Sequence, residues 1–411
     1  MSGQDATLHL MPDTMHALAV SAHTATSALG RGLDAHAEAL RAMRGGLARN
    51  SISSAPLDCC TGRVDGIEDA PLPEPLANWE CRNNRLAWIG LAQDGFVEAV
   101  AHAVERHGRA RVAVLMGTST GSIATTESGY RRLGADGRLP ADTRRPIIHC
   151  LHSLSAFVRT ALDLAGPCLT VSTACSSSAK VYAMAARMIQ AGLVDAAVVG
   201  GVDTLCDSVL FGFNSLELVS RRACRPFDSG RDGISIGEAA GFALLERSEH
   251  APHAPRLVGY GESSDAYHMS TPHPDGAGAE QAMREALARA GLAPDRVDYI
   301  NLHGTATRKN DEVEGALLAR LFPVGTAASS TKGFTGHTLG AAGTLEASIA
   351  LLALERGLLP GNLGCRAPEP AWAGHLLLAS RDAEVGVALS NSFGFGGNNA
   401  CLAFARAEAL A

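Results

Sequence analysis

Short apolar, β-branched runs alternate with stretches of helical periodicity along the chain, and this alternation most constrains its fold. It predicts an α/β fold with largely parallel sheets, buried on both faces between helix layers. The predicted strands span residues 17–20, 111–116, 167–171, 195–199, 241–246, 256–260, 297–302, 327–330, 384–390 and 400–404. The predicted helices span 32–43, 86–107, 176–192, 278–290, 311–321 and 340–356, and segments 55–78 and 119–146 are predicted to be irregular surface.

The strand–helix rhythm occurs twice. Residues 248–255 form a connector without apolar periodicity, and the alternation starts again behind them. We therefore predict two similar halves, residues 1–247 and 256–411, related by internal duplication. A chain of 411 residues is long enough for two such halves.

Composition excludes several classes of function. The net charge of −7 argues against nucleic-acid binding as the main task. The chain has no apolar run of about eighteen residues, which a membrane-spanning helix needs. Residues 1–10 lack the basic start and apolar core of a signal peptide. The ten cysteines are scattered, mostly through apolar runs, which predicts a reducing, cytoplasmic location.

One cysteine occupies a position that favours chemistry. Cys175 lies between the predicted strand at 167–171 and the helix that starts at Ser176. The dipole and unpaired N–H groups of a helix N-terminus favour an anion, so we expect this thiol to ionise more readily than a free cysteine. A nucleophile on a strand-to-helix turn is typical of several hydrolases and transferases. A small buried residue of the core is the alternative.

Three polar, glycine-rich segments of the second half also follow predicted strands. They hold His303, then Lys332 and His337, then Phe393 and Phe395. Because active sites of open α/β sheets form at the carboxyl ends of strands, these segments could converge with the cysteine. Each has a plainer alternative: a histidine that holds a turn, a lysine on the surface, phenylalanines of the core. The spacing lacks the close Cys or His pairs of common zinc sites, so we predict no metal.

Together these motifs resemble the β-ketoacyl-acyl-carrier-protein synthases of the thiolase superfamily. The sequence TACSSS at 173–178 is similar to the nucleophile motif of that family, and HGTAT at 303–307 to its first histidine motif. Lys332 with GHTLGAAG at 336–343, and NSFGFGG at 391–397, are similar to its other two motifs. One cysteine with two histidines resembles the elongating branch, since the initiating branch has an asparagine in place of one histidine. The resemblance implies a thiolase-like fold and substrates carried on phosphopantetheine, with no cofactor of the enzyme's own.

The resemblance also implies roles for the polar residues. Cys175 would carry the acyl group. His303 and His337 would stabilise the enolate that forms when malonyl-acyl-carrier protein loses CO₂. Lys332 and Glu346 would form a charged pair that organises the two histidines.

The glycine loop and the first histidine motif would contact the substrate. The backbone N–H of Phe395, with that of the nucleophile, would form the oxyanion hole, and Phe393 and Phe395 would gate the acyl pocket. Thr305 and Thr307 would contact the phosphopantetheine arm. Arg308 departs from the family, which frequently has proline there, and the segment 216–226 is shorter than in housekeeping enzymes. Such departures resemble a specialised synthase, for example one that makes a polyene or polyketide.

Two other members of the superfamily are alternatives. A chain-length factor, the non-catalytic partner in a ketosynthase heterodimer, usually lacks the nucleophile, whereas Cys175 is present here. A thiolase needs a second reactive cysteine near the C-terminal glycine loop. The cysteine nearest that loop is Cys401, which we expect to pack in the core.

The resemblance implies two partners. Acyl carrier proteins are acidic, so a basic patch near the entrance of the active site would attract them despite the negative net charge. The arginine pairs at 131–132, 144–145 and 221–222 are candidates for that patch. Synthases of this family resemble dimers paired along a sheet edge near the nucleophile strand, with a second copy or with a ketosynthase-like subunit.

Overall fold

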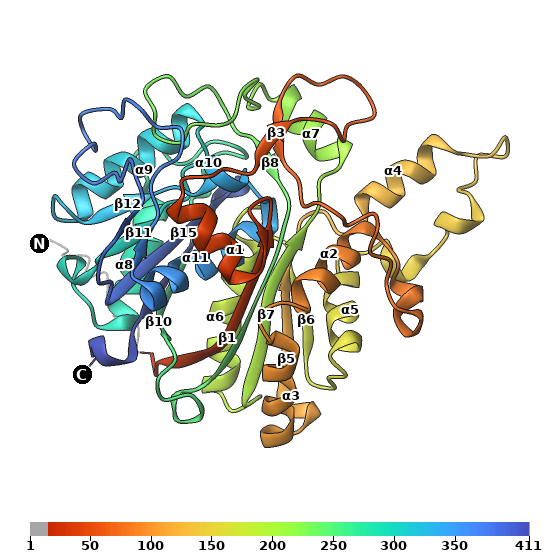
Figure 1. The fold of residues 1–411 in the computed structure, drawn as a ribbon, viewed down its shortest axis with the longest axis horizontal. Coiled ribbons are helices and arrows are strands. Elements are labelled where there is room, and N and C mark those ends of the chain that lie inside the picture. Colours follow the sequence, from red (N-terminus) through yellow and green to blue (C-terminus); the bar gives the residue numbers. More distant parts are fainter. Residues whose placement is uncertain (1–14, 411) are drawn as a thin grey trace, which may run out of the picture.

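The computed structural model of this chain describes residues 15–410, in which eleven strands form one large sheet (Figure 1). The segment 1–10, considered above as a signal peptide and rejected, lies outside the described residues. Within 15–410 no helix is both long and apolar enough to cross a membrane.

The two halves of the sheet have the same topology. Numbered by their order along the chain, the five main strands of each half lie side by side in the order first, fifth, fourth, second, third. The first strand of one half lies next to the first strand of the other in the middle of the sheet, where they pair at only two positions. The first half contains β1 (Leu18–Ser27), β5 (Val112–Gly117), β6 (Cys168–Val171), β7 (Ala196–Asp203) and β9 (Ala239–Arg247). The eleventh strand, the two-residue β2 (Gly30–Arg31), pairs only with the end of β1. The second half contains β10 (Arg256–Ser264), β11 (Tyr299–Asn301), β12 (Ala327–Ser329), β15 (Val387–Gly394) and β16 (Asn398–Ala405). The fold class with two similar halves is confirmed, while the residue limits of the halves stay a prediction.

The sheet is mixed, whereas the sequence predicted largely parallel sheets. In each half the fifth strand is antiparallel to both of its neighbours, and only the fourth, second and third strands run parallel. In the second half the cause is local. Only residues 395–397 separate β15 from β16, and so short a turn joins antiparallel strands.

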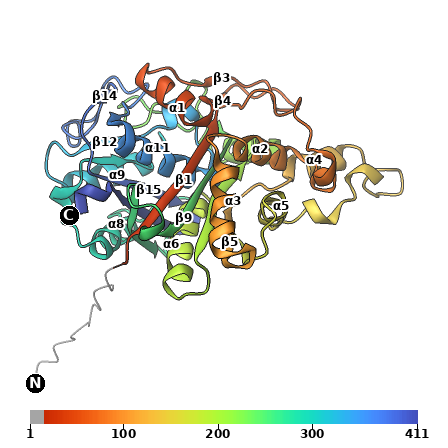
Figure 2. The same cartoon turned by 60° about the horizontal axis from the view of Figure 1, so that its bottom comes forward.

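Helices cover both faces of the sheet (Figures 1 and 2). Alternate residues of β5 point to opposite faces, so Ala113 and Leu115 join one core cluster and Val112 and Val114 another. The first cluster contains α6 (Ser177–Gln190) and α11 (Ala342–Arg356) and strands of both halves. The outer face of the first half packs against α2 (Arg82–Leu91), α3 (Phe96–His107) and α5 (Ser153–Ala161). The corresponding face of the second half packs against α8 (Ala277–Ala290) and α9 (Arg308–Leu321).

Two segments differ from the helices predicted from the sequence. The single helix predicted at 86–107 is broken between α2 and α3, where Asp94 and Gly95 have left-handed backbone conformations (φ 56° and 66°). The carboxylate of Asp94 accepts hydrogen bonds from the Leu33 N–H and the Thr24 hydroxyl, a tertiary contact that holds the break. The segment 119–146, predicted to be irregular, contains α4 (Ile123–Arg131), which projects from the body of the molecule (Figure 1).

Candidate active site

Cys175 lies on the turn from β6 to α6, as the sequence predicts. Ala174 has a left-handed conformation (φ 53°), which is strained for a residue with a Cβ atom. Ser177 stabilises this turn, since its Oγ accepts the N–H of Thr173 at 2.9 Å and its hydroxyl donates to the carbonyl of Ala174. The turn places the Cys175 side chain in the interior, where the residue is only 5% exposed.

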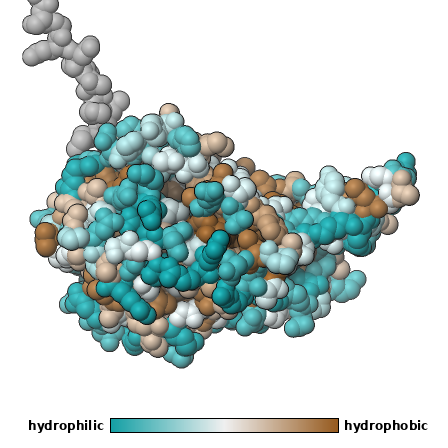
Figure 3. All heavy atoms as spheres, turned by 90° about the horizontal axis from the view of Figure 1, so that it is seen from above, coloured by the Kyte–Doolittle hydropathy of each residue, from teal (hydrophilic) through white to brown (hydrophobic). Residues whose placement is uncertain are grey.

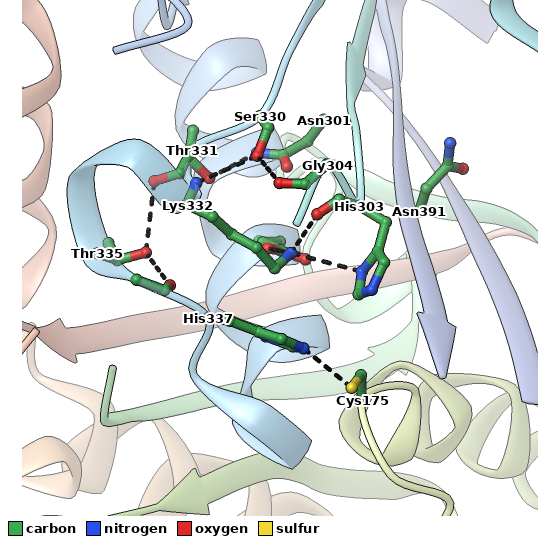
Figure 4. Close-up of polar contacts among 12 residues, drawn as sticks. Cys175, Asn301, His303, Gly304, Ser330, Thr331, Lys332, Thr335, His337 and Asn391 are labelled. Carbon is green, nitrogen blue, oxygen red and sulfur yellow. Dashed lines mark hydrogen bonds and ion pairs between the residues drawn. The ribbon is translucent and has the colours of Figure 1, made fainter. Parts of the chain in front are cut away.

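The two predicted histidines meet this cysteine (Figure 4). His303 follows β11, and His337 lies just after α10 (Lys332–Thr335). The Nε2 atom of His337 is 2.9 Å from the Sγ of Cys175, and the two imidazole rings are 5.3 Å apart at nearly a right angle. Segments that are 162 residues apart in the sequence thus form one buried cluster.

A buried ammonium group fixes the orientation of His303. The Nζ of Lys332 donates to the carbonyl of His303 at 2.6 Å, forms an ion pair with Glu346, and lies 3.4 Å from the Nδ1 of His303. An ammonium group can only donate, so Nδ1 is the acceptor and the ring carries its proton at Nε2. The pair predicted between Lys332 and Glu346 is present and almost completely buried.

Glu314 on α9 is a site residue that the motifs do not reveal. Its two carboxylate oxygens accept the backbone N–H groups of His303 and Gly304 at 2.8 and 2.7 Å, and Asn391 donates to it at 3.2 Å. It therefore holds the turn that carries the first histidine. The sequence offered one signal for this role. Glu314 lies three residues before Leu317 in the predicted helix, so its carboxylate lies on the same, apolar face of that helix.

Burial keeps the three central groups neutral. It lowers the pKa of His303 and of His337 well below the usual value, and the charge of Lys332 lowers both further. Burial also raises the pKa of the Cys175 thiol to about 11, although Lys332 and the N–H of Phe395 act in the opposite direction. The expected easy ionisation of this thiol was wrong. Cys175 precedes the N-cap of α6 and lies at the buried end of a cavity, so the loss of solvent around the thiol outweighs the effect of the helix terminus.

The glycine loop between β15 and β16 closes over the cysteine. Gly394 approaches the Cys175 turn so closely that a Cβ atom there would lie 2.9 Å from the carbonyl oxygen of Thr173. This approach puts the N–H of Phe395 beside the thiol. Phe393 packs against the His303 ring at 5.9 Å. The Phe395 ring packs at 5.4 Å against Phe213 of α7 (Asp207–Ser215).

A cavity of about 430 Å³ leads from Cys175 to the surface. This volume is in the range of small-molecule sites. Both histidines, the glycine loop, Thr305 and Thr307 line the cavity, and the hydroxyls of the two threonines are 2.9 Å apart. The expected core position of Cys401 is confirmed, because this residue is fully buried on β16.

The arginine pairs considered for carrier docking are mostly engaged. Among the described residues, Arg144 and Arg221 form no ion pair. The other four have partners: Arg131 with Asp207 and Glu127, Arg132 with Asp142, Arg145 with the carbonyl of Glu80, and Arg222 with Asp232.

The cysteine and the two histidines could in principle bind a soft metal ion, because their ligand atoms lie within 4.8 Å of one another. The ammonium group of Lys332 beside His303 would repel such an ion. That the site functions without a metal stays a prediction.

Two family models match this chain: "Beta-ketoacyl synthase, N-terminal domain" over residues 83–251 and "Beta-ketoacyl synthase, C-terminal domain" over residues 255–366. The chain is 35% identical over 312 residues to 3-oxoacyl-[acyl-carrier-protein] synthase 2 of Coxiella burnetii, a match that covers 72% of this chain and 75% of that protein. The chain belongs to the β-ketoacyl synthase family.

Other relatives agree with this membership. The mitochondrial 3-oxoacyl-[acyl-carrier-protein] synthase of Arabidopsis thaliana is 42% identical over 260 residues, which are 58% of this chain and 56% of that protein. A chain in the solved complex of the ketosynthase ApeO with its chain length factor ApeC from Xenorhabdus doucetiae superposes with a TM-score of 0.87 and 40% identity, covering 95% of this chain and 98% of that one. The family and the enzyme class predicted from the motifs, an acyltransferase, are confirmed.

Proposed function

We propose that this protein is an elongating ketosynthase. It condenses an acyl group held on Cys175 with malonyl-acyl-carrier protein and releases CO₂ and a β-ketoacyl-acyl-carrier protein. The observation that carries this proposal is the convergence of Cys175, His303 and His337 at the inner end of one cavity, with reactive atoms within 4.8 Å of one another. A non-catalytic chain-length factor has no need of this arrangement.

The first step transfers the acyl group to Cys175. The neutral thiol gives its proton to the Nε2 of His337, 2.9 Å away, as the sulfur attacks the thioester carbonyl. The N–H groups of Cys175 and Phe395 stabilise the oxyanion of the tetrahedral intermediate. The bond between the carbonyl carbon and the phosphopantetheine sulfur then breaks, and the leaving thiolate takes the proton from His337.

The second step uses both histidines as donors. Acylated Cys175 has no proton to give to His337, so this neutral histidine can hold its single proton at Nε2. Lys332, beside the Nδ1 of His303, keeps the proton of that histidine at Nε2 as well. Both N–H groups donate to the malonyl thioester oxygen as the bond to the carboxylate breaks and CO₂ leaves. The carbanion attacks the acyl-Cys175 carbonyl, the carbon–sulfur bond breaks, and the released Cys175 thiolate takes up one proton from solvent, which is the one proton that the reaction consumes for each malonyl carboxylate that leaves as CO₂.

The substrates arrive on an acidic carrier protein, and Thr305 and Thr307 guide the phosphopantetheine arm toward Cys175. These two threonines line the same cavity as Cys175 and the two histidines, which supports that role. The enzyme needs no cofactor besides the arm of its carrier. Its ten cysteines are all unpaired, which fits the reducing cytoplasm.

The strand β6 at the edge of the sheet is the proposed site of pairing with a second subunit. Its backbone has no neighbour on one side among the described residues, and a free edge pairs readily with another strand. Large apolar side chains are exposed on and around this strand and on the segment that carries α4: Tyr130, Leu133, Ile147, Leu151 and Leu169. On the projecting part of the molecule, Figure 3 shows hydrophobic surface among hydrophilic surface. The match to the ketosynthase and chain-length-factor complex favours a heterodimer. The departures from the family pattern at Arg308 and at 216–226 support a specialised polyene or polyketide synthase.

Intact-protein mass spectrometry tests the first step. The protein is incubated with a panel of acyl-carrier proteins, beside the Cys175→Ala variant. A mass increase equal to the acyl group, present only when Cys175 is intact, is the expected result. If no donor acylates the folded protein, even beside a chain-length-factor subunit, the protein is a non-catalytic subunit and the proposal is wrong.

A further inference from the structure

The entrance of the Cys175 cavity carries a cation that no described residue neutralises. Arg308 is exposed in the first turn of α9 and lines the same cavity as Cys175. Within residues 15–410 its guanidinium forms no ion pair. A positive side chain at a helix N-terminus is unfavourable, because that end of the helix is itself positive. The stability of α9 therefore gives no reason for an arginine here.

The backbone that carries Arg308 is held at several points. Ala306 has a left-handed conformation (φ 67°) and donates its N–H to the carboxylate of Asp311 at 3.2 Å. The carbonyl of Ala306 accepts the N–H of Gly233 at 3.1 Å, and the carbonyl of Arg308 accepts from Arg231 at 3.2 Å. These contacts fix the Cα of Arg308 at the rim of the cavity, so its side chain samples the entrance rather than a distant surface.

The remaining charges at the entrance make Arg308 the one cation there without a partner among the described residues. Glu217 is also exposed and has no ion pair within residues 15–410. Its carboxylate and that of Asp265 would repel an anion from the parts of the cavity wall where they lie. The other charged groups that line the cavity have partners: Lys309 with Glu312 at 3.1 Å, Asp232 with Arg222 at 3.2 Å, and Asp265 with Asn399 at 2.7 Å. An anion that enters is therefore directed to Arg308.

We propose that Arg308 binds the phosphate of a phosphopantetheine arm whose thioester reaches Cys175. The inference rests on the proposed function. Such an arm bears its negative charge at the end far from sulfur, so with sulfur at the inner end of the cavity the phosphate lies near the entrance. A guanidinium can give two parallel N–H groups to phosphate oxygens, which an ammonium group cannot. Coenzyme A and a carrier protein present this arm alike.

The test compares two soluble substrates that differ only in the phosphate: an acyl-phosphopantetheine and the acyl-pantetheine with the same acyl group. The rate of Cys175 acylation is measured by intact mass over a range of each substrate. In the wild-type protein the KM for the phosphorylated thioester should be the lower one. Arg308→Ala should reduce this KM ratio about tenfold, the loss of one charge-assisted contact, and Arg308→Glu should reduce it further.

Arg320→Ala is the matched control. It removes the same charge from the other end of α9, where Arg320 pairs with Glu280, and should leave the KM ratio as in the wild type. The inference is wrong if Arg308→Ala keeps the wild-type ratio, or if Arg320→Ala reduces it equally. Either outcome leaves the proposed function intact, because Cys175 is still acylated. Failure of the wild-type protein to be acylated by any thioester would overturn both. Parallel assays with acyl-coenzyme A and acyl-carrier protein show which source of the arm depends on Arg308.

Discussion

The variant His303→Ala is expected to lose malonyl decarboxylation by about 10²–10³-fold. In the proposed reaction, the imidazole is one of two donors to the enolate oxygen, and Lys332, 3.4 Å from Nδ1, keeps its proton at Nε2. One preorganised donor in a buried site contributes about 3–4 kcal/mol to stabilising the transition state, and each 1.36 kcal/mol is about tenfold in rate. His337→Ala should lose a similar amount. Because both rings serve the same oxygen, the double variant should lose less than the product of the two effects.

The assay follows the release of labelled CO₂ from malonyl-acyl-carrier protein. Two controls accompany it. Cys175→Ala keeps both donors and should still decarboxylate while failing to accept an acyl group. His102→Ala removes an exposed histidine of α3 and should behave as the wild type. Near-normal decarboxylation by both His303→Ala and His337→Ala would refute the enolate site.

Four further results are expected. Lys332→Ala should lower the free energy of unfolding by about 3–5 kcal/mol in urea titrations, because it leaves the carboxylate of Glu346 buried and unpaired, and restoration by the double variant with Glu346→Gln would verify this cause. Glu314→Gln should lower the melting temperature and the rate of decarboxylation, since an amide has one acceptor oxygen for two buried N–H groups; an unaltered melting curve would speak against it. Alkylation of Cys175 by iodoacetamide should rise about tenfold per pH unit from pH 8 to 10, because the thiol pKa of about 11 leaves the thiolate fraction growing over that whole range, whereas a plateau below pH 9 would contradict the raised pKa. Dialysis against a strong chelator should leave condensation intact, and loss of activity restored by zinc would contradict the prediction of a metal-free site.

The local patterns of the sequence predicted what depends on neighbours in the chain. The change from an apolar strand to helical spacing located the turn at Cys175, and polar segments behind strands located His303 and His337. Strand ends of α/β sheets carry active-site residues, which marked these segments as candidates. However, β6 lies at one end of the strand order and β11 and β12 at the other, so the convergence of the residues depends on how the two halves pack together around α6 and α11.

Long-range contacts explain what the sequence did not predict. The break between α2 and α3 depends on the contact of Asp94 with Leu33, which lies 61 residues away. The raised pKa of Cys175 depends on its burial, to which His337 and the Phe395 loop of the second half contribute, and which a helix terminus considered alone does not include. Glu314 carries no motif, and its role comes from the approach of α9 to the turn after β11.

The central claim is that Cys175, His303 and His337 together perform a decarboxylative condensation, and product mass is its most direct test. An acyl-carrier protein and malonyl-acyl-carrier protein are incubated with the protein, with and without a chain-length-factor subunit, and the carrier-bound products are analysed by mass spectrometry. A β-ketoacyl chain, longer than the donor by two carbons and absent with Cys175→Ala, is the predicted result. Acylation of Cys175 with malonyl-carrier protein consumed but no β-ketoacyl product would contradict it.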